Sequence, residues 1–152
     1  MLARREFPIG NFIRDPKDLS YTPAPDVFHD LYGHLPFFAD AAYANFCADL
    51  GLRASRYLDS PTKIRQFERL FWFAVEFALL ETPVGRRIFG AGIASSFGEC
   101  RYALSNEPEL IPFDLHVIRA QEFKIDEFQK RLFVIKDVGQ LYGCLDSFEA
   151  GL

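Results

Sequence analysis

The sequence predicts a mainly α-helical fold with a small β-hairpin near the C-terminus. Three observations lead to this prediction. Apolar residues recur at helical spacing in several segments, Pro and Gly stand where such segments would begin or end, and only one late stretch, 132–135, is rich in β-branched and aromatic residues. The 152 residues, 49% of them hydrophobic, suit one domain with a sizeable core, so we expect 1–152 to form a single domain.

The first helix is expected to begin at Thr22-Pro23, with Thr as its cap and Pro at its first position. Before it, 1–21 should be irregular, because Pro and Gly interrupt every periodic pattern there. The helix should end at Gly33, a residue that favours the left-handed conformation after a helix, and Pro36 should bar its continuation.

Two longer helices should follow. One is predicted over 40–50, ending at Gly51, and its apolar residues would share one face. A third is predicted over 62–80, which contains the most apolar stretch of the chain. The residues expected on the shared face of the second helix are Tyr43, Phe46, Cys47 and Leu50.

The second half of the chain should contain shorter elements. Thr82-Pro83 reads as another capped helix start, and the small residues of 90–98 predict a loop or a closely approached backbone. The β-prone residues 132–135 would pair with 123–125 to form the hairpin. Helices are predicted over 99–104, 114–120 and 137–148.

Composition excludes several classes of function. A net charge of −4 and a pI near 5.4, without clustered basic residues, argue against a nucleic-acid partner. The longest apolar run has 11 residues and is interrupted by Glu76, and no signal-peptide pattern opens the chain, so no membrane span or export is expected. Three widely spaced cysteines, Cys47, Cys100 and Cys144, read as reduced thiols of a cytoplasmic protein.

Glu76 is the most informative residue of the sequence. It lies within the apolar run 70–80, and no Lys or Arg stands one helical turn away to neutralise it. A lone buried carboxylate costs several kcal/mol unless it is protonated, paired or bound to a metal. Glu76 therefore needs a distant partner, which is either an arginine or a metal ion. The arginines considered are Arg53, Arg56 and Arg101.

Two of the three histidines lie close together, at His29 and His34. Two histidines and one carboxylate are the ligands of the facial triad in non-haem Fe(II) oxygenases. In a continuous α-helix, residues five apart would lie about 140° apart around the axis. Both rings can then reach one metal only if the helix breaks, and Gly33 is expected to supply the break. Two hydrogen-bonded imidazoles without a metal are the alternative.

The chain is rich in aromatic residues, with 17 Phe and 6 Tyr. They suit a pocket for an aromatic ligand, or simply a core rich in Phe. Apolar surface left uncovered in so short a chain would favour a homodimer.

Several motifs resemble the aromatic amino acid hydroxylase family. They comprise Phe12-Ile13-Arg14, Tyr21-Thr22-Pro23-Ala24-Pro25-Asp26, His29-Asp30-Leu31-Tyr32-Gly33-His34-Leu35-Pro36, Phe71-Trp72-Phe73-Ala74-Val75-Glu76-Phe77, the stretch from Gly90 to Glu99, and Glu127-Phe128-Gln129. Their order and spacing are kept across most of the chain. The resemblance implies a hydroxylase-like catalytic core in a single catalytic domain, 1–152.

The resemblance also implies roles for individual residues. His29, His34 and Glu76 would be the catalytic residues and bind Fe(II), and Arg14 would hold the carboxylate of an aromatic amino acid through its planar fork. Arg14 could instead be a surface residue paired with Asp15 or Asp18. The residues implied to bind the substrate ring are Thr22, Pro25, Trp72, Phe77, Gly92 and Ser95. Each of these also has a purely structural reading, as helix cap, core residue, turn or local hydrogen-bonding group.

The cofactors implied by the resemblance are Fe(II) and a tetrahydropterin. Asp30 stands where many members have a glutamate and is implied to bind the cofactor, and Phe71 stands where a tyrosine is often found. No residue of this sequence matches the family's pterin-stacking aromatic, so the pterin is less directly supported than iron.

The function expected is therefore Fe(II)-dependent hydroxylation of L-phenylalanine to L-tyrosine by O2. Two alternatives remain: an oxygenase of the same scaffold with another reductant or aromatic substrate, and a non-catalytic binding module stabilised by a metal such as Zn(II).

Overall fold

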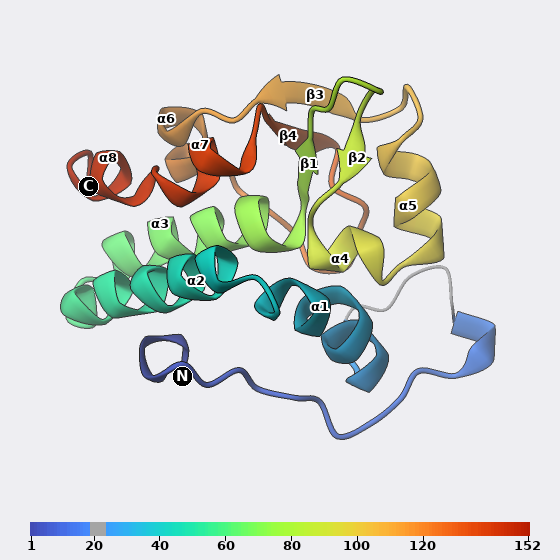
Figure 1. Cartoon of the computed structure of the whole chain (residues 1–152), viewed down its shortest axis with the longest axis horizontal. Coiled ribbons are helices and arrows are strands. Elements are labelled where there is room, and N and C mark those ends of the chain that lie inside the picture. Colours follow the sequence, from blue (N-terminus) through green and yellow to red (C-terminus); the bar gives the residue numbers. More distant parts are fainter. Residues whose placement is uncertain (19–23) are drawn as a thin grey trace.

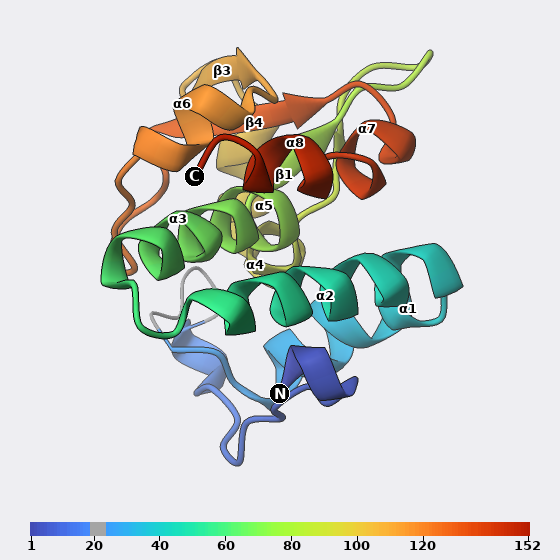
Figure 2. The same ribbon diagram turned by 90° about the vertical axis from the view of Figure 1, so that its left-hand side faces the viewer.

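A small sheet and a set of helices form the molecule in the computed structural model, which describes residues 1–18 and 24–152 (Figures 1 and 2). The helices are α1 (Leu35–Phe38), α2 (Ala41–Ala54), α3 (Pro61–Phe71), α4 (Ala91–Ala94), α5 (Phe97–Ala103), α6 (Leu115–Ala120), α7 (Val138–Tyr142) and α8 (Leu145–Glu149). Two π-helical turns, His29–His34 and Trp72–Glu76, and three short 3-10 turns, Leu2–Arg4, Pro16–Asp18 and Ser55–Tyr57, complete the helical structure. The prediction of a mainly α fold is confirmed.

The sheet has four strands in the order β2-β1-β4-β3, formed by β1 (Ala78–Leu80), β2 (Arg87–Ile88), β3 (Glu109–Pro112) and β4 (Arg131–Ile135). β4 lies parallel to both β1 and β3, while β2 runs antiparallel to β1. The predicted strand 132–135 is confirmed, but its pairing with 123–125 is wrong. Parallel partners must come from distant segments, so the sequence gives no local sign of them.

The segment predicted as a helix over 62–80 contains a helix and a strand. α3 ends at Phe71, a π turn follows, and the chain then enters β1. Thr82-Pro83 does not start a helix either. Gly85 N donates to Thr82 O at 2.9 Å, which closes a turn between β1 and β2. In the four residues 82–85, Pro at the second position and Gly at the fourth favour a β-turn. Because Pro also favours the start of a helix, the sequence alone did not separate the two structures.

α2 confirms the predicted buried face but extends beyond the predicted end. Asp40 caps it by accepting a hydrogen bond from Tyr43 N at 2.9 Å, and the helix continues through Gly51 to Ala54. A Cβ at Gly51 would lie 2.5 Å from the Cβ of Leu2, so glycine permits close packing of the N-terminal turn rather than ending the helix. The buried residues of α2 are Tyr43, Phe46, Cys47 and Leu50.

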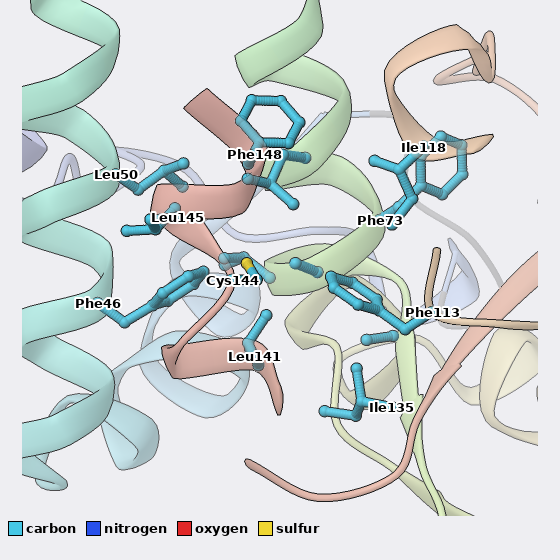
Figure 3. Packing of buried hydrophobic residues seen from close by; sticks show 14 of the residues in the cluster. Phe46, Leu50, Phe73, Phe113, Ile118, Ile135, Leu141, Cys144, Leu145 and Phe148 are labelled. Atoms are coloured by element: carbon cyan, nitrogen blue, oxygen red, sulfur yellow. The ribbon is translucent and has the colours of Figure 1, made fainter. Parts of the chain in front are cut away.

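The main core lies between α2, α3, the C-terminal helices and the sheet (Figure 3). It takes most of its volume from large side chains, among which Phe73, Phe133 and Phe148 are at most 1% exposed. Most of the buried Phe residues therefore belong to the core, which agrees with the interpretation of the composition as a core rich in Phe. α6 forms within the predicted 114–120, and α5 covers most of the predicted 99–104. The single helix predicted over 137–148 is two helices, α7 and α8, and α8 ends one residue beyond the predicted segment.

None of the helices in the described ranges has the length and apolar character that crossing a membrane requires.

Candidate metal centre and pocket

The helix that carries both histidines does not break at Gly33. It is helical from residue 27, forms the π turn His29–His34, and continues as α1 to Phe38. The start predicted at Thr22-Pro23 lies outside the described residues. Leu35 N donates to Asp30 O, an i to i+5 hydrogen bond that widens the turn. The wide turn, rather than a break, brings residues five apart onto one side.

Gly33 and Pro36 have other roles than those predicted. A Cβ at Gly33 would lie 2.8 Å from Ala91 O, so glycine lets α4 approach this turn closely. Pro36 lies in the first turn of the resumed α-helix, where a missing backbone N–H is tolerated.

Glu76 ends the second π turn, Trp72–Glu76, and is 7% exposed. Phe77 N donates to Trp72 O at 2.9 Å, again an i to i+5 bond. Gly90, just after β2, lies against this turn, because a Cβ there would be 2.1 Å from Glu76 O. Both expected ligand segments are thus π turns, which occur frequently at functional sites.

The three expected ligand side chains meet at one point. His34 Nε2 lies 2.9 Å from His29 Nε2 and 3.1 Å from Glu76 Oε1, and His29 Nε2 lies 3.6 Å from Glu76 Oε2. Ligands about 2.1 Å from one ion and at right angles to each other would be about 3 Å apart. The donor set therefore fits one face of an octahedral divalent cation. It is the one such group of His, Cys, Asp and Glu found among the described residues.

Ser95 orients His29. Its hydroxyl lies 2.9 Å from Ala91 O, to which it donates, and it therefore accepts from His29 Nδ1 at 2.7 Å. With its proton on Nδ1, His29 presents the Nε2 lone pair to the point where the three expected ligands meet. Burial lowers the pKa of His29, which keeps the ring neutral near pH 7. His34, 1% exposed, packs against the ring of Phe7 at a centroid distance of 4.5 Å.

The arginines considered as partners of Glu76 all make other contacts. Arg53 pairs with acidic residues of α2 and α8, Arg56 pairs with Glu149, and Arg101 lies over the ring of Phe97. Within the described parts of the chain, both ion-pair partners of Glu76 are histidines. The arginine alternative is therefore wrong.

Arg14 is a buried residue, 9% exposed, and its ion-pair partner is Asp26. The alternative of a surface arginine is therefore wrong. Its Nε and Nη2 donate to the two oxygens of Asp26 at 2.9 and 2.6 Å, and its Nη1 donates to Ser95 O at 2.7 Å. These hydrogen bonds hold the pKa of Asp26 well below its usual range. Of the five guanidinium N–H groups, two have no acceptor among the described residues.

A cavity of about 320 Å³ adjoins two of the three expected ligands, His29 and Glu76. Trp72 and Phe77 form an aromatic wall, with their ring centroids 4.6 Å apart. Of the residues implied to bind the substrate, Thr22 lies outside the described residues and all the others line this cavity. Those found in its lining are Arg14, Pro25, Trp72, Phe77, Gly92 and Ser95, together with Phe71.

A second cavity, of about 750 Å³, borders all three expected ligands from the side of the N-terminal segment. Asp30, implied to bind the cofactor, lies on its wall and is 4% exposed. One oxygen of Asp30 accepts a hydrogen bond from Gly10 N at 2.6 Å, so it also fixes the N-terminal segment. The point where the three side chains meet is thus bordered by two cavities.

Two charged residues of the site were given no role by sequence reasoning. The pairing of Asp26 with Arg14 across 12 residues had no local signal. Glu99 lines the first cavity and is 4% exposed, and burial together with the charge of Glu76 raises its pKa to about 7. In the sequence, Glu99 stands three residues after Ser96, a spacing that indicates a helix cap rather than a pocket residue.

The chain matches a known family over nearly all its length. The family model described as biopterin-dependent aromatic amino acid hydroxylase matches residues 1–151. The phenylalanine-4-hydroxylase of Caulobacter vibrioides is 42% identical over 141 residues, which are 92% of this chain and 48% of that protein. The phenylalanine-4-hydroxylase of Bos taurus is 40% identical over 134 residues, which are 88% of this chain and 29% of that protein.

Solved structures show the same similarity. The phenylalanine hydroxylase of Chromobacterium violaceum with bound iron(III) and 7,8-dihydrobiopterin has a TM-score of 0.88 and 40% identity, covering 99% of this chain and 54% of that one. The structure of the same enzyme bound to cobalt also has a TM-score of 0.88, and the match covers 94% of this chain and 52% of that one. The chain thus spans about half the length of these bacterial relatives.

Proposed function

Because the chain belongs to the family of biopterin-dependent aromatic amino acid hydroxylases, we propose that residues 1–152 form the catalytic domain of a mononuclear non-haem iron monooxygenase. Its reaction is the hydroxylation of L-phenylalanine to L-tyrosine, in which one atom of O2 enters the ring and a two-electron reductant supplies the electrons that reduce the other atom. The observation that carries this proposal is the convergence of His29, His34 and Glu76 beside an aromatic-lined cavity.

In this proposal, His29, His34 and Glu76 hold Fe(II) on one face and leave the other coordination positions open. The metal supplies the activation of oxygen that no side chain can perform. Ser95 keeps the lone pair of His29 directed at the metal, and the surrounding apolar residues keep water out. The ring of the substrate lies between Pro25, Trp72 and Phe77, with Gly92 and Ser95 bordering it.

Gly92 lets the ring of Phe77 lie close to the backbone of α4. A Cβ at this position would lie 2.8 Å from Cζ of Phe77, so any larger residue would displace the aromatic wall. Thr22 is proposed as a further contact of the substrate on the basis of the family motif alone.

The second cavity would admit the reductant. It opens onto the same three ligands, and Asp30 on its wall offers a carboxylate to a tetrahydropterin. The support for the pterin is the family match and the dihydrobiopterin bound to the relative from Chromobacterium violaceum. The three cysteines are free, which supports a reducing compartment such as the cytoplasm.

The reaction can be tested directly. The chain would be loaded with Fe(II) without oxygen, then exposed to O2 and L-phenylalanine with and without tetrahydropterin, and the products read by mass. We expect a gain of one oxygen atom that requires iron and O2 together. Product without pterin would point to another reductant, and binding of Zn(II) with no turnover under any condition would leave only the non-catalytic module.

Arg14 is proposed to bind the carboxylate of the substrate with the two N–H groups that have no acceptor in the described residues. Replacing Arg14 with Ala should weaken L-phenylalanine binding well over tenfold, because removing one partner of a buried charge pair typically costs about 2–5 kcal/mol. Arg14→Lys should restore only part of the affinity, since an ammonium lacks the fork. Calorimetric titration measures the affinity.

Metal content is the control for this experiment and should not change. Unaltered binding by Arg14→Ala, or equal binding of L-phenylalanine and its decarboxylated amine by the parent, would contradict an amino-acid substrate.

A homodimer is proposed from the exposed apolar face of the helix that carries the histidines. Phe28, Leu31, Tyr32 and Leu35 lie at helical spacing and are each 41–60% exposed. An apolar patch of this kind usually marks an interface. Solution scattering at tens of micromolar should give a dimer mass, and Leu31→Ser should lower it; a monomer mass for the parent would refute the proposal.

A further inference from the structure

Glu99 is a buried carboxylate in the wall of the first cavity. In the part of the chain that the structure describes, no cation pairs with it and no hydrogen bond reaches its carboxyl group. Burial and the charge of Glu76 both disfavour the ionised form of Glu99 and raise its pKa to about 7. An ionised carboxylate in this buried position is costly unless a ligand supplies the missing cation.

The role as a helix cap does not account for the carboxyl group. Ser96 caps α5 by accepting from Glu99 N at 3.3 Å, which is one half of a capping box. In the other half, the carboxyl of Glu99 would accept from Ser96 N. That N–H instead donates to Ile93 O at 3.1 Å. The side chain of Glu99 is therefore available to the cavity.

Metal binding does not account for it either. The cluster of possible ligand atoms within 4.8 Å of one another consists of His29, His34 and Glu76 and does not include Glu99. The triad already supplies the one carboxylate that the facial arrangement needs.

The position of Glu99 relative to Arg14 points to its ligand. Arg14 Nη1 donates to Ser95 O, and Ser95 directly precedes the residue that caps the helix of Glu99. Both charged side chains also line the same cavity of about 320 Å³. An amino acid carries its carboxylate and its ammonium on one carbon atom, so it requires an anion-binding and a cation-binding group at the same end of a pocket.

We propose that Glu99 binds the α-ammonium group of the amino-acid substrate while Arg14 binds its α-carboxylate. The inference rests on the proposed function and adds to it the group that distinguishes an amino acid from other aromatic acids. The contact replaces water around the ammonium with a charged hydrogen bond in a buried site, where such bonds are strong.

Binding measurements with two ligands test the proposal. L-phenylalanine and 3-phenylpropanoate share the ring and the carboxylate, but only the first has an ammonium group. Both would be titrated calorimetrically into the Co(II)-loaded chain, for the parent and for Glu99→Gln. Glu107→Gln, which removes an exposed carboxylate outside the cavity, is the matched control.

We expect Glu99→Gln to weaken L-phenylalanine binding by about tenfold or more and to leave 3-phenylpropanoate binding unchanged or tighter. Glu107→Gln should change neither. Glu99→Asp, which keeps the charge on a shorter side chain, should retain part of the preference for the amino acid. Unchanged melting temperature and cobalt content will show that the variants are folded and loaded.

Three results would overturn the inference. They are equal affinity of Glu99→Gln and parent for L-phenylalanine, equal losses for both ligands, and a parent that binds both ligands equally well. The last result would leave an aromatic carboxylate as the substrate and the iron site intact. A parent that binds neither ligand would overturn the proposed substrate itself.

Discussion

Replacing Glu76 with Ala is expected to abolish stoichiometric Fe(II) binding. The two imidazoles would remain, but the only anionic ligand would be lost. Since the partners that merely orient a metal ligand are typically worth about 10–100-fold in affinity, loss of a ligand itself should cost more than about 100-fold. His29→Ala and His34→Ala should have the same consequence. Equilibrium dialysis with iron analysis measures the loss.

Matched control substitutions separate the loss of a metal ligand from a loss of the fold. Glu81 is exposed and follows β1, and His116 is exposed on α6, so their replacement by Ala should leave iron binding intact. The helical circular dichroism of all variants should stay close to that of the parent. Tight one-to-one Fe(II) binding by Glu76→Ala would disprove its assignment as a ligand.

Replacing Gly90 with Ala is expected to destabilise the fold and the metal centre together. The new Cβ would lie 2.1 Å from Glu76 O and 2.4 Å from Glu76 C, and backbone atoms cannot move aside as a flexible side chain can. Overpacking of this kind costs about 3 kcal/mol or more when nothing relaxes. Denaturant unfolding should show this loss, and iron affinity should fall because the clash displaces the backbone of Glu76.

Gly85 provides the control for the loss of a glycine. It has φ +97°, but a Cβ there would meet nothing closer than 3.9 Å. Gly85→Ala should therefore cost only the strain of a left-handed residue, about 1–2 kcal/mol, and leave iron affinity unchanged. Equal effects of the two substitutions would contradict a specific contact between Gly90 and Glu76.

The sequence was sufficient to single out the side chains that converge, because burial of a charge is a physical cost that can be read from the chain alone. Glu76 lacked a local partner, and the structure gives it two histidine partners. The buried face of α2 and the starts of the helices predicted from residues 40, 114 and 137 could also be predicted, since helix starts and helical periodicity depend on neighbouring residues.

The remaining features depend on contacts between distant segments. A π turn has no characteristic residue, so the helix of His29 and His34 was expected to break where it only widens. The parallel pairing of β4 with β1 and β3 joins segments far apart in sequence. Asp26 and Glu99 were not assigned roles because their environment exists only after the chain has folded.

We propose that His29, His34 and Glu76 together hold one iron ion. X-ray absorption at the iron edge of the anaerobically Fe(II)-loaded chain shows which atoms surround the metal. We expect one iron per chain, nitrogen and oxygen ligands at about 2.1 Å, and the scattering pattern of two imidazoles. Iron that shows no imidazole scattering, or the pattern of two imidazoles in His29→Ala, would contradict the proposal.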